Sequence, residues 1–531
     1  MNKAKRWTLG LALGLAALGG SLGSGVAQEK TLTVLRVVDS FTYDPQKATA
    51  AATSEIAFLI GDTLLALDPD MKRVHPLLAK SWNVTPDGKT YTFTLRDDVS
   101  FCSGKKMTSA DVVYTFERMI DPQNKKPSAQ KMGKVKSIRA DGPYKVIYEL
   151  EEPYNELPYT LTLMHATILN KENVDALGKD FGLKGIDGTG PYCWDSWTPR
   201  NELVIKRHDG YKWGPEIYKN HGPAHITKMV WKVVPEDASR VAALVSGQGD
   251  LSYAIPLWAV DDLKKAPNLN VTQVPNYYRT CTMGLKITRP LMSDINVRKA
   301  MNMAIDRAAM AKNVYFGHAI PAPAYLNPDT PDFNPATQNT PLGKYNPAES
   351  KKLLDAAGWK VGSDGIREKD GVRLSPVLFT LSGPSNLSVA TALQGYFRAV
   401  GVDLKIEPYD ATAYFTKIAT QDFDGYYLCN PYASAGDVLN VYWRSENRPI
   451  PNRMNWVDKE TDDWLNAALT ATDPKVKAEN YYKVQQKVVD NALWIPIVHD
   501  FMFMAAAKKL KDVKPHATFT SALYKGLDIT Y

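Results

Sequence analysis

Three short patterns in the sequence match parts of catalytic or phosphate-binding motifs, and none has the context that its chemistry needs. Residues 19–23 spell GxSxG, but they lie inside an N-terminal segment that is expected to be removed, not between a strand and a helix. Residues 88–90 end like a phosphate-binding loop, yet the required first glycine is Asn83. Gly188 and Gly190 begin a GxGxxG whose last position is Cys193.

Metal chemistry has equally little support. His221 and His225 are four residues apart, but Gly222 and Pro223 between them prevent a helix that would place both rings on one face. The HExxH pattern is absent from the sequence. We therefore expect no catalytic residue, no metal site and no cofactor.

The side chains suited to recognition are aromatic rings beside arginine and asparagine. In the densest cluster, Tyr277 and Tyr278 can stack on a planar group while Arg279 binds a carboxylate. The alternative that one tyrosine is a core residue and that Arg279 faces water stays open. A second cluster contains Asn430, Tyr432, Tyr442, Trp443 and Arg444.

The N-terminus has the order of a cleavable signal peptide. Three basic residues come first, an apolar run covers 9–18, and small residues end at Ala27. The run of about ten residues is too short to span a bilayer. Cys102 is the first cysteine, so no lipid anchor is expected. The prediction is a signal peptide over 1–27 and a mature chain free in the periplasm, without membrane insertion.

Composition excludes several other classes. Removing the leader's three basic residues lowers the formal net charge from +7 to +4, too mild an excess for a nucleic-acid surface. Hydrophobic residues make up 44% of the chain, as in ordinary globular proteins. The length suggests two to four domains.

The chain contains four cysteines, and in an exported protein an even number favours disulfides over reactive thiols. Spacing alone permits three pairings. No CxxC unit occurs, so a zinc or redox site has no support.

Short strands alternate with amphipathic helices, which favours an α/β fold. The turn at 86–88 predicts a hairpin from Ser81 to about Leu95, and Thr108 with Asp111 predicts a helix start. Asp294 is the expected N-cap of a helix whose apolar face reaches Ala308.

Prolines shape two later segments. Pro347 at a first turn and Gly358 at a stop bound another helix. Residues 321–341 contain six prolines and are expected to be a long surface loop.

Five motifs in order resemble family 5 extracellular solute-binding proteins, which bind dipeptides, oligopeptides and nickel chelates. They are TPDGKTYTFTLRDDVSFCSGKKMTSADVVYTFERM (85–119), GTGPY (188–192), INVRKAMNMAIDR (295–307), YNPAESKKLLDAAGWK (345–360) and ALWIPIVHD (492–500). They sample the mature chain from end to end.

The resemblance implies a class II periplasmic-binding-protein fold of the α/β type, with two lobes, three domains and a hinge. Domain I would comprise 28–73, 187–274 and 500–531, domain II 74–186, and domain III 275–499. A solute would bind between the lobes, which close over it by differential affinity.

The resemblance also implies cleft residues. Phe41 and Tyr43 fall where the family lines its cleft, and Arg453 and Asn455 lie in a loop similar to its asparagine-rich loop. The family's peptide binders carry an aspartate near 431–434 that holds the peptide α-amine, whereas this chain has no acid between Asp424 and Asp437. An unpaired buried ammonium is costly, so free peptides become less favoured ligands unless Asp437 substitutes.

Cys281 and Cys429 fall near positions that the family's oligopeptide binders join by a disulfide. That pairing leaves Cys102 for Cys193.

The function that the resemblance implies is that of the monomeric substrate-binding component of an ABC importer, working with a permease and its ATPase and not as an enzyme. The solute is expected to be peptide-like or another small polar molecule. Alternatives are an opine, a glutathione-like conjugate, an oligosaccharide or a metal chelate, or a sensory or chaperone protein that presents its ligand.

Overall fold

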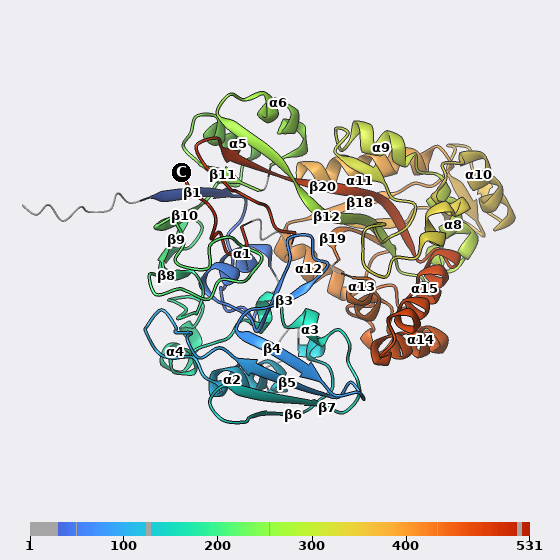
Figure 1. Ribbon diagram of the computed structural model, residues 1–531. Helices are drawn as coiled ribbons and strands as arrows, with labels where there is room; N and C mark the ends of the chain where they lie inside the picture. Colours follow the sequence, from blue (N-terminus) through green and yellow to red (C-terminus); the bar gives the residue numbers. More distant parts are fainter. Residues whose placement is uncertain (1–29, 49, 124–128, 254, 433, 518–522) are drawn as a thin grey trace, which may run out of the picture.

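The computed structural model describes residues 30–48, 50–123, 129–253, 255–432, 434–517 and 523–531. This part of the chain forms two lobes that two long neighbouring strands connect (Figure 1). We call residues 30–273 and 502–531 the first lobe and residues 278–501 the second lobe. The main core of the first lobe is formed by buried residues between 32 and 253 and between 504 and 529, and the cores of the second by residues between 281 and 498.

The regular elements of the first lobe are strands, α-helices and short 3₁₀ helices. In chain order they are β1 (Thr31–Arg36), α1 (Ala51–Ile60), β2 (Leu65–Leu67), β3 (Val74–Pro76), β4 (Ala79–Val84), β5 (Thr90–Leu95), α2 (Ser109–Ile120), η1 (Ala129–Met132), β6 (Val135–Ala140), β7 (Lys145–Leu150), α3 (Leu157–Thr160), η2 (Met164–Ala166), α4 (Lys171–Leu177), η3 (Gly178–Asp180), β8 (Tyr192–Thr198), β9 (Glu202–Arg207), β10 (Lys228–Val233), α5 (Asp237–Val245), β11 (Leu251–Ser252), η4 (Leu257–Ala259) and α6 (Val260–Lys265).

The connecting strand β12 (Leu269–Leu285) leads into the second lobe. Its elements are α7 (Pro290–Ser293), α8 (Ile295–Met303), α9 (Arg307–Asn313), β13 (Ala319–Pro321), η5 (Pro335–Asn339), η6 (Pro341–Gly343), α10 (Pro347–Ala356), β14 (Lys360–Val361), β15 (Arg367–Lys369), β16 (Val372–Arg373), β17 (Val377–Leu381), α11 (Pro384–Arg398), β18 (Lys405–Tyr409), α12 (Ala411–Thr420), β19 (Gly425–Pro431), α13 (Ala435–Tyr442), η7 (Ser445–Asn447), α14 (Lys459–Thr470) and α15 (Pro474–Asp490). The returning strand is β20 (Trp494–Ala507).

One mixed sheet runs through both lobes in the order β18-β17-β19-β12-β20-β11-β1-β10-β9-β8, with β13 also paired to β20. Strands β12 and β20 are antiparallel, with Leu269 opposite Ala507 in the first lobe and Gly284 opposite Trp494 in the second. Their register shifts between Gln273 and Tyr278. A second shift lies between Cys281 and Thr282, inside the second lobe. The longer interruption, from Gln273 to Tyr278, lies where the strands pass between the lobes.

The predicted hairpin is confirmed as β4 and β5, which pair antiparallel within a four-stranded sheet of order β4-β5-β7-β6. Thr108 and Asp111 form the predicted capping box at the start of α2, because each side chain binds the other's backbone N–H. This helix packs on the sheet at the bottom of Figure 1 through its buried residues Val112, Phe116 and Met119.

Asp294 caps α8 as predicted, and its carboxylate accepts a hydrogen bond from the N–H of Asn296. The predicted extension of this helix to Ala308 is wrong, since α8 ends at Met303. Asp306 caps a new helix, α9, by accepting from the N–H of Ala309. An aspartate can start a helix as readily as it can sit inside one, and here its capping bond divides the apolar run into two helices.

The regular structure within the segment 321–341 is one strand end, the short 3₁₀ helix η5 and the first residue of η6, in line with the predicted loop. It is not purely a surface feature. Tyr325 and Leu326 are each 1% exposed and belong to a core of the second lobe. The burial of Tyr325 and Leu326 could not be predicted, because the proline-rich sequence around them has neither helical nor strand periodicity.

Both disulfides join the cysteines that the family resemblance paired, Cys102 with Cys193 and Cys281 with Cys429. Cys281 and Cys429 are directly opposite each other in β12 and β19. Among the described residues, no helix has the length and apolar character needed to cross a membrane.

Candidate functional site

In the first lobe the two predicted ligand residues have opposite environments. Phe41 is 70% exposed, whereas Tyr43 is 1% exposed and packs edge-on against Trp194 and Trp197 at 5.4 and 5.1 Å between ring centroids. The Tyr43 hydroxyl lies 2.7 Å from Oδ1 of Asp39. Both the ring and the hydroxyl of Tyr43 therefore make contacts within their own lobe.

Arg279 lies on β12, where the strand enters the second lobe. Its Nε donates to Oδ1 of Asp500 at 3.1 Å, and its Nη2 contacts Oδ2 of the same carboxylate. Asp500 is 1% exposed, so this two-pronged contact fixes the guanidinium against the strand β20. The side chains of Tyr277 and Tyr278, also predicted here, lie outside the described residues.

The second predicted cluster forms an aromatic group inside the second lobe. Trp443 is fully buried, and its ring centroid lies 5.1 Å from that of Trp494. The ring centroid of Tyr442 lies 5.3 Å from that of Trp494 and 6.2 Å from that of Tyr432. Asn430 contacts this group through a long hydrogen bond of 3.4 Å to the Tyr432 hydroxyl.

Arg453 and Asn455 lie in the loop beside this aromatic group. The guanidinium of Arg453 is 5.8 Å from the ring centroid of Tyr426, within cation–π range. Asn455 has a φ of 58° and donates to Oε1 of Gln421 at 2.9 Å. The structure thus brings Tyr432, Tyr442, Trp443 and Arg453 together and leaves Phe41 and Tyr43 in the other lobe.

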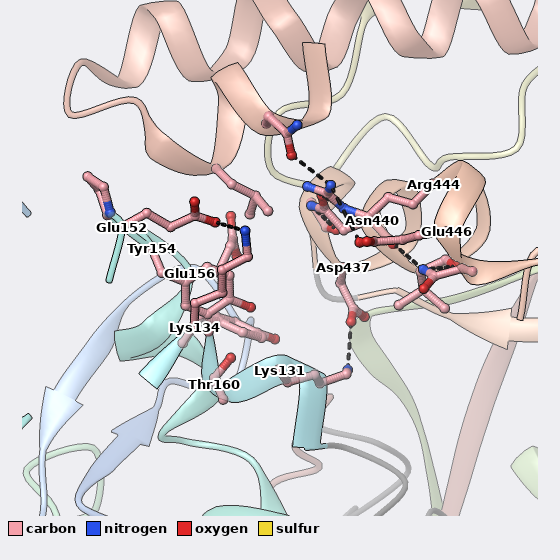
Figure 2. Close-up of a pocket in the computed structure, with 18 of the residues that line it drawn as sticks. Lys131, Lys134, Glu152, Tyr154, Glu156, Thr160, Asp437, Asn440, Arg444 and Glu446 are labelled. Carbon is pink, nitrogen blue, oxygen red and sulfur yellow. Dashed lines mark hydrogen bonds and ion pairs between the residues drawn. The ribbon is translucent and has the colours of Figure 1, made fainter. Parts of the chain in front are cut away.

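A pocket of about 770 Å³ opens between the lobes (Figure 2). The segment 131–163 of the first lobe forms one wall, and the segment 436–469 of the second lobe forms the other. Of the predicted cluster residues whose side chains are described, Arg444 is part of these walls. The others are not: Phe41, Tyr43, Arg279, Asn430, Tyr432, Tyr442, Trp443, Arg453 and Asn455. The main polar lining residues are Lys131, Lys134, Glu152, Glu156, Tyr159, Thr160, Asp437, Asn440, Arg444, Glu446, Asp462 and Asn466.

Charged groups of both signs face each other across this pocket. Nζ of Lys131 lies 2.8 Å from Oδ1 of Asp437, the contact that Figure 2 marks between the two walls. Asp437, the acid considered as a substitute amine ligand, is therefore in the pocket and paired with a lysine of the opposite lobe. Arg444 donates to the amide oxygens of Asn440 at 3.0 Å and Asn466 at 2.7 Å, and its Nη1 lies 3.9 Å from Oε1 of Glu446.

Burial raises the pKa of Glu156, and the nearby ammonium of Lys477 only partly opposes that effect. Sequence reasoning missed Lys131, Glu156 and Tyr159 as pocket residues. No local pattern marks them, because the opposite wall lies about 300 residues further along the chain.

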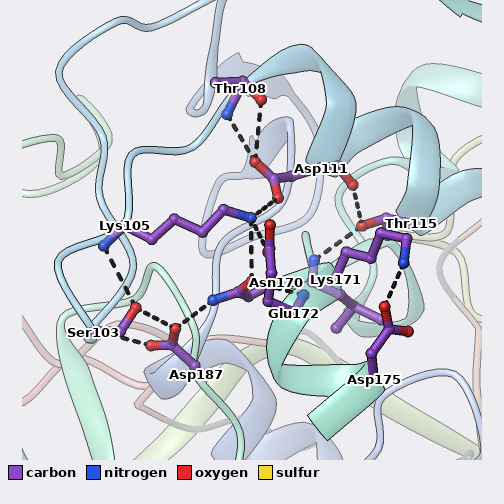
Figure 3. A network of polar contacts seen from close by, with 11 residues as sticks. Ser103, Lys105, Thr108, Asp111, Thr115, Asn170, Lys171, Glu172, Asp175 and Asp187 are labelled. Atoms are coloured by element: carbon purple, nitrogen blue, oxygen red, sulfur yellow. Dashed lines mark hydrogen bonds and ion pairs between the residues drawn. The ribbon is translucent and has the colours of Figure 1, made fainter.

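A second polar cluster lies in the first lobe, where its side chains bind one another (Figure 3). Nζ of Lys105 lies 2.6 Å from Oδ1 of Asp111 and also contacts Glu172. Asp187 accepts from Asn170 at 2.6 Å and from the Ser103 hydroxyl at 2.5 Å. These bonds tie the loop before α2 to the start of α4, which is a structural role.

The two-lobed architecture and the pocket between the lobes are typical of solute-binding proteins. Residues 73–448 match the family described as bacterial extracellular solute-binding proteins, family 5. The match covers more than half of the chain, so the chain belongs to this family. It is an extracellular solute-binding protein of family 5.

Two similar proteins are described as glutathione-binding proteins. The glutathione-binding protein GsiB of Salmonella paratyphi A is 27% identical over 512 residues, covering 93% of this chain and 94% of the relative. The corresponding GsiB of Escherichia coli strain K12 is 26% identical over 510 residues, with coverage of 94% and 95%.

Solved structures share the fold across 94% of this chain. The oligopeptide-binding protein AppA of Bacillus subtilis, in complex with a nonapeptide, has a TM-score of 0.83 at 22% identity, with 98% of that chain covered. NikA of Brucella suis, in complex with Fe(III)-EDTA, has a TM-score of 0.82 at 22% identity, with 99% covered.

Proposed function

We propose that this chain captures one peptide-like or other small polar solute between its lobes in the periplasm and delivers it unchanged to the permease of an ABC importer. The observation that carries this proposal is the pocket that both lobes line, with the Lys131–Asp437 ion pair joining its walls. A site that only two lobes together complete is suited to a carrier, because the solute then stabilises one arrangement of the lobes.

The pocket has the size and polarity of a small-molecule site. Its volume of about 770 Å³ lies within the roughly 300–1,000 Å³ of typical ligand pockets. Ammonium, guanidinium, carboxylate and amide groups on its walls favour a solute that carries both charges and several hydrogen-bonding groups. Peptides and glutathione, which the named relatives bind, meet that description.

We infer that the hinge lies where β12 and β20 pass between the lobes. The register shift between Gln273 and Tyr278 supports this placement, since few regular ladder bonds would have to change when the lobes move. The predicted boundaries near residues 274 and 499 fall beside this irregular part. Domains I and II would then move together against domain III.

The route to the periplasm rests on the N-terminal 27 residues, which we propose are removed on export. These residues lie outside the part of the chain that the structure describes. Their order of basic, apolar and small residues supports cleavage before Gln28. We further propose that the mature chain acts as a monomer, which hands its solute to the permease while the paired ATPase drives transport.

Mass spectrometry of the protein purified from its native host tests the proposal. The chain is isolated without added ligand and unfolded, and the released small molecules are identified and counted. We expect close to one polar solute per chain, with a dissociation constant near micromolar, about −8 kcal/mol. Chains that release no solute, or that convert an added solute into a new compound, would contradict the proposed function.

A further inference from the structure

The first-lobe wall of the pocket contains a carboxylate whose charge is incompletely balanced. Glu156 belongs to the first lobe, immediately before α3, and its side chain is 12% exposed. The opposite lobe approaches it closely, since a Cβ atom added to Gly436 would come within 2.9 Å of Oε1 of Glu156. This carboxylate therefore lies where the two walls of the pocket meet.

One lysine serves two carboxylates at this point. Nζ of Lys477 lies 3.6 Å from Oε1 of Glu156 and 3.0 Å from Oδ2 of Asp332. One ammonium between two largely buried acids leaves about one negative charge unbalanced. Such a charge is expensive to keep away from water unless another cation arrives.

The other basic residues of the pocket are bound elsewhere. Lys131 pairs with Asp437 at 2.8 Å, and Lys134 pairs with Glu152 at 3.1 Å. Arg444 is held by amide oxygens of the second lobe. None of these three is placed to balance the Glu156 carboxylate.

Two oxygen atoms on the same wall are buried and accept no hydrogen bond of normal length from a described residue, and the Lys477 ammonium lies 3.6 Å from the first of them. They are Oε1 of Glu156 and the hydroxyl oxygen of Tyr159. The pKa of Tyr159 is raised, by burial first and then by the carboxylates of Asp437, Glu156 and Asp68. The surroundings of this hydroxyl are therefore negative, and both atoms can accept a hydrogen bond from a donor that enters the pocket.

We propose that the Glu156 end of the pocket, with the Tyr159 hydroxyl on the same wall, binds a cationic group of the solute, either an ammonium or a guanidinium. This inference rests on the proposed function and specifies its solute class. A cationic group would supply the missing positive charge and donate to both oxygens. It would bind to the first lobe, where Gly436 of the second lobe approaches Glu156.

The test compares free-amine and acetylated forms of the same ligands. A mixture of tripeptides and tetrapeptides, each present with a free amino terminus and as its N-acetyl form, is offered to protein stripped of solute by unfolding and refolding. Retained members are identified by mass spectrometry. The matched control is Glu216→Gln, since Glu216 is an exposed glutamate of the first lobe that does not line the pocket.

We expect the wild-type protein and Glu216→Gln to retain free-amine forms at least tenfold over acetylated ones. Glu156→Gln should bring that ratio near one, and Tyr159→Phe should lower it several-fold. A merely structural role of Glu156 in closing the lobes would weaken both forms alike and leave the ratio unchanged. An unchanged ratio in Glu156→Gln, or a wild-type preference for acetylated forms, overturns the inference.

The solute recovered from the host separates this inference from the function on which it rests. A host solute without an amine or guanidine overturns the cationic subsite and leaves the proposed function standing. Retention of no peptide, together with a basic host solute whose affinity Glu156→Gln does not lower, also overturns the subsite. Recovery of no solute at all overturns both.

Discussion

Nζ of Lys131 and Oδ1 of Asp437 are 2.8 Å apart although the two residues are 306 positions apart in the sequence and belong to different lobes. Their side chains are 21% and 16% exposed, so water screens the pair only in part. An ion pair in this position favours the arrangement in which the walls of the pocket face each other. It links the charge on the pocket walls to the relative position of the lobes.

Replacing Lys131 by methionine should weaken solute binding about fivefold. The change removes a partly buried ion pair worth about 1 kcal/mol and leaves Asp437 without its partner in the other lobe. Titration calorimetry with the solute recovered from the host measures the effect. Lys145→Met is the control, because its exposed pair with Asp141 lies within the first lobe and outside the pocket lining. Equal affinities for the two variants would show that the cross-lobe pair does not contribute to binding.

Removing the disulfide between Cys281 and Cys429 should destabilise the second lobe by about 2 to 4 kcal/mol. The bond closes a loop with a sequence separation of 148 residues and joins β12 to β19. Urea unfolding of the double variant Cys281→Ser and Cys429→Ser measures the change. The matched variant without Cys102 and Cys193 should destabilise the first lobe instead. Unfolding of the second lobe at unchanged urea concentration would disprove the expected contribution.

Lys525 should be among the most sensitive positions in the first lobe. Its ammonium is fully buried and lies 2.6 Å from Oδ1 of Asp62, while it also donates to the carbonyl oxygens of Phe58 and Gly61. Lys525→Met strands a buried carboxylate and should cost about 3 to 5 kcal/mol of unfolding free energy.

The control for Lys525 is Lys145→Met, which removes an exposed pair with Asp141 and should cost well under 1 kcal/mol. Both variants are compared by urea unfolding. Similar losses for the two would show that the Lys525 network is not a main support of the lobe.

Glu55 should give the first lobe a pH-dependent stability. Burial raises the pKa of Glu55 from 4.5 to about 7, against the opposing effect of Arg36. Between these values the folded state binds more protons than the unfolded state, so stability falls as pH rises through this window. The loss should total roughly 3 kcal/mol between pH 4.5 and 8.

The variant Glu55→Gln should lack this decline, so its stability relative to the wild type should rise across the same window. Urea unfolding at several pH values provides the comparison, with the exposed Glu216→Gln as the control. Parallel stability curves for the wild type and Glu55→Gln would contradict the assignment of the raised pKa.

Local features of the fold were predictable because their causes lie close together in the sequence. Thr108 and Asp111 define a helix start within four residues, and the turn at 86–88 determines which strands pair. Asp306 shows the limit of such reasoning, since the apolar pattern around it suits one long helix or two short ones equally well. The capping bond to Ala309 decides between them, and the pattern does not contain that information.

The pocket could not be predicted because it depends on how the two lobes are placed. Glu156 and Lys131 have ordinary sequence neighbours, and only the approach of α13 and α15 gives them their partners. The local density of aromatic residues led to the prediction of Trp443 as a ligand residue. Its ring instead packs within the core of its lobe. Aromatic clusters near arginine are common both in binding sites and in cores, so the sequence alone does not separate the two.

The most direct test of lobe closure is small-angle X-ray scattering of the stripped protein with and without the solute recovered from its host. If the lobes close over the solute, the radius of gyration becomes smaller at saturating solute, with a midpoint that matches the dissociation constant from calorimetry. A radius that stays constant while the solute binds would contradict lobe closure, because the solute would then occupy a site that does not depend on both lobes.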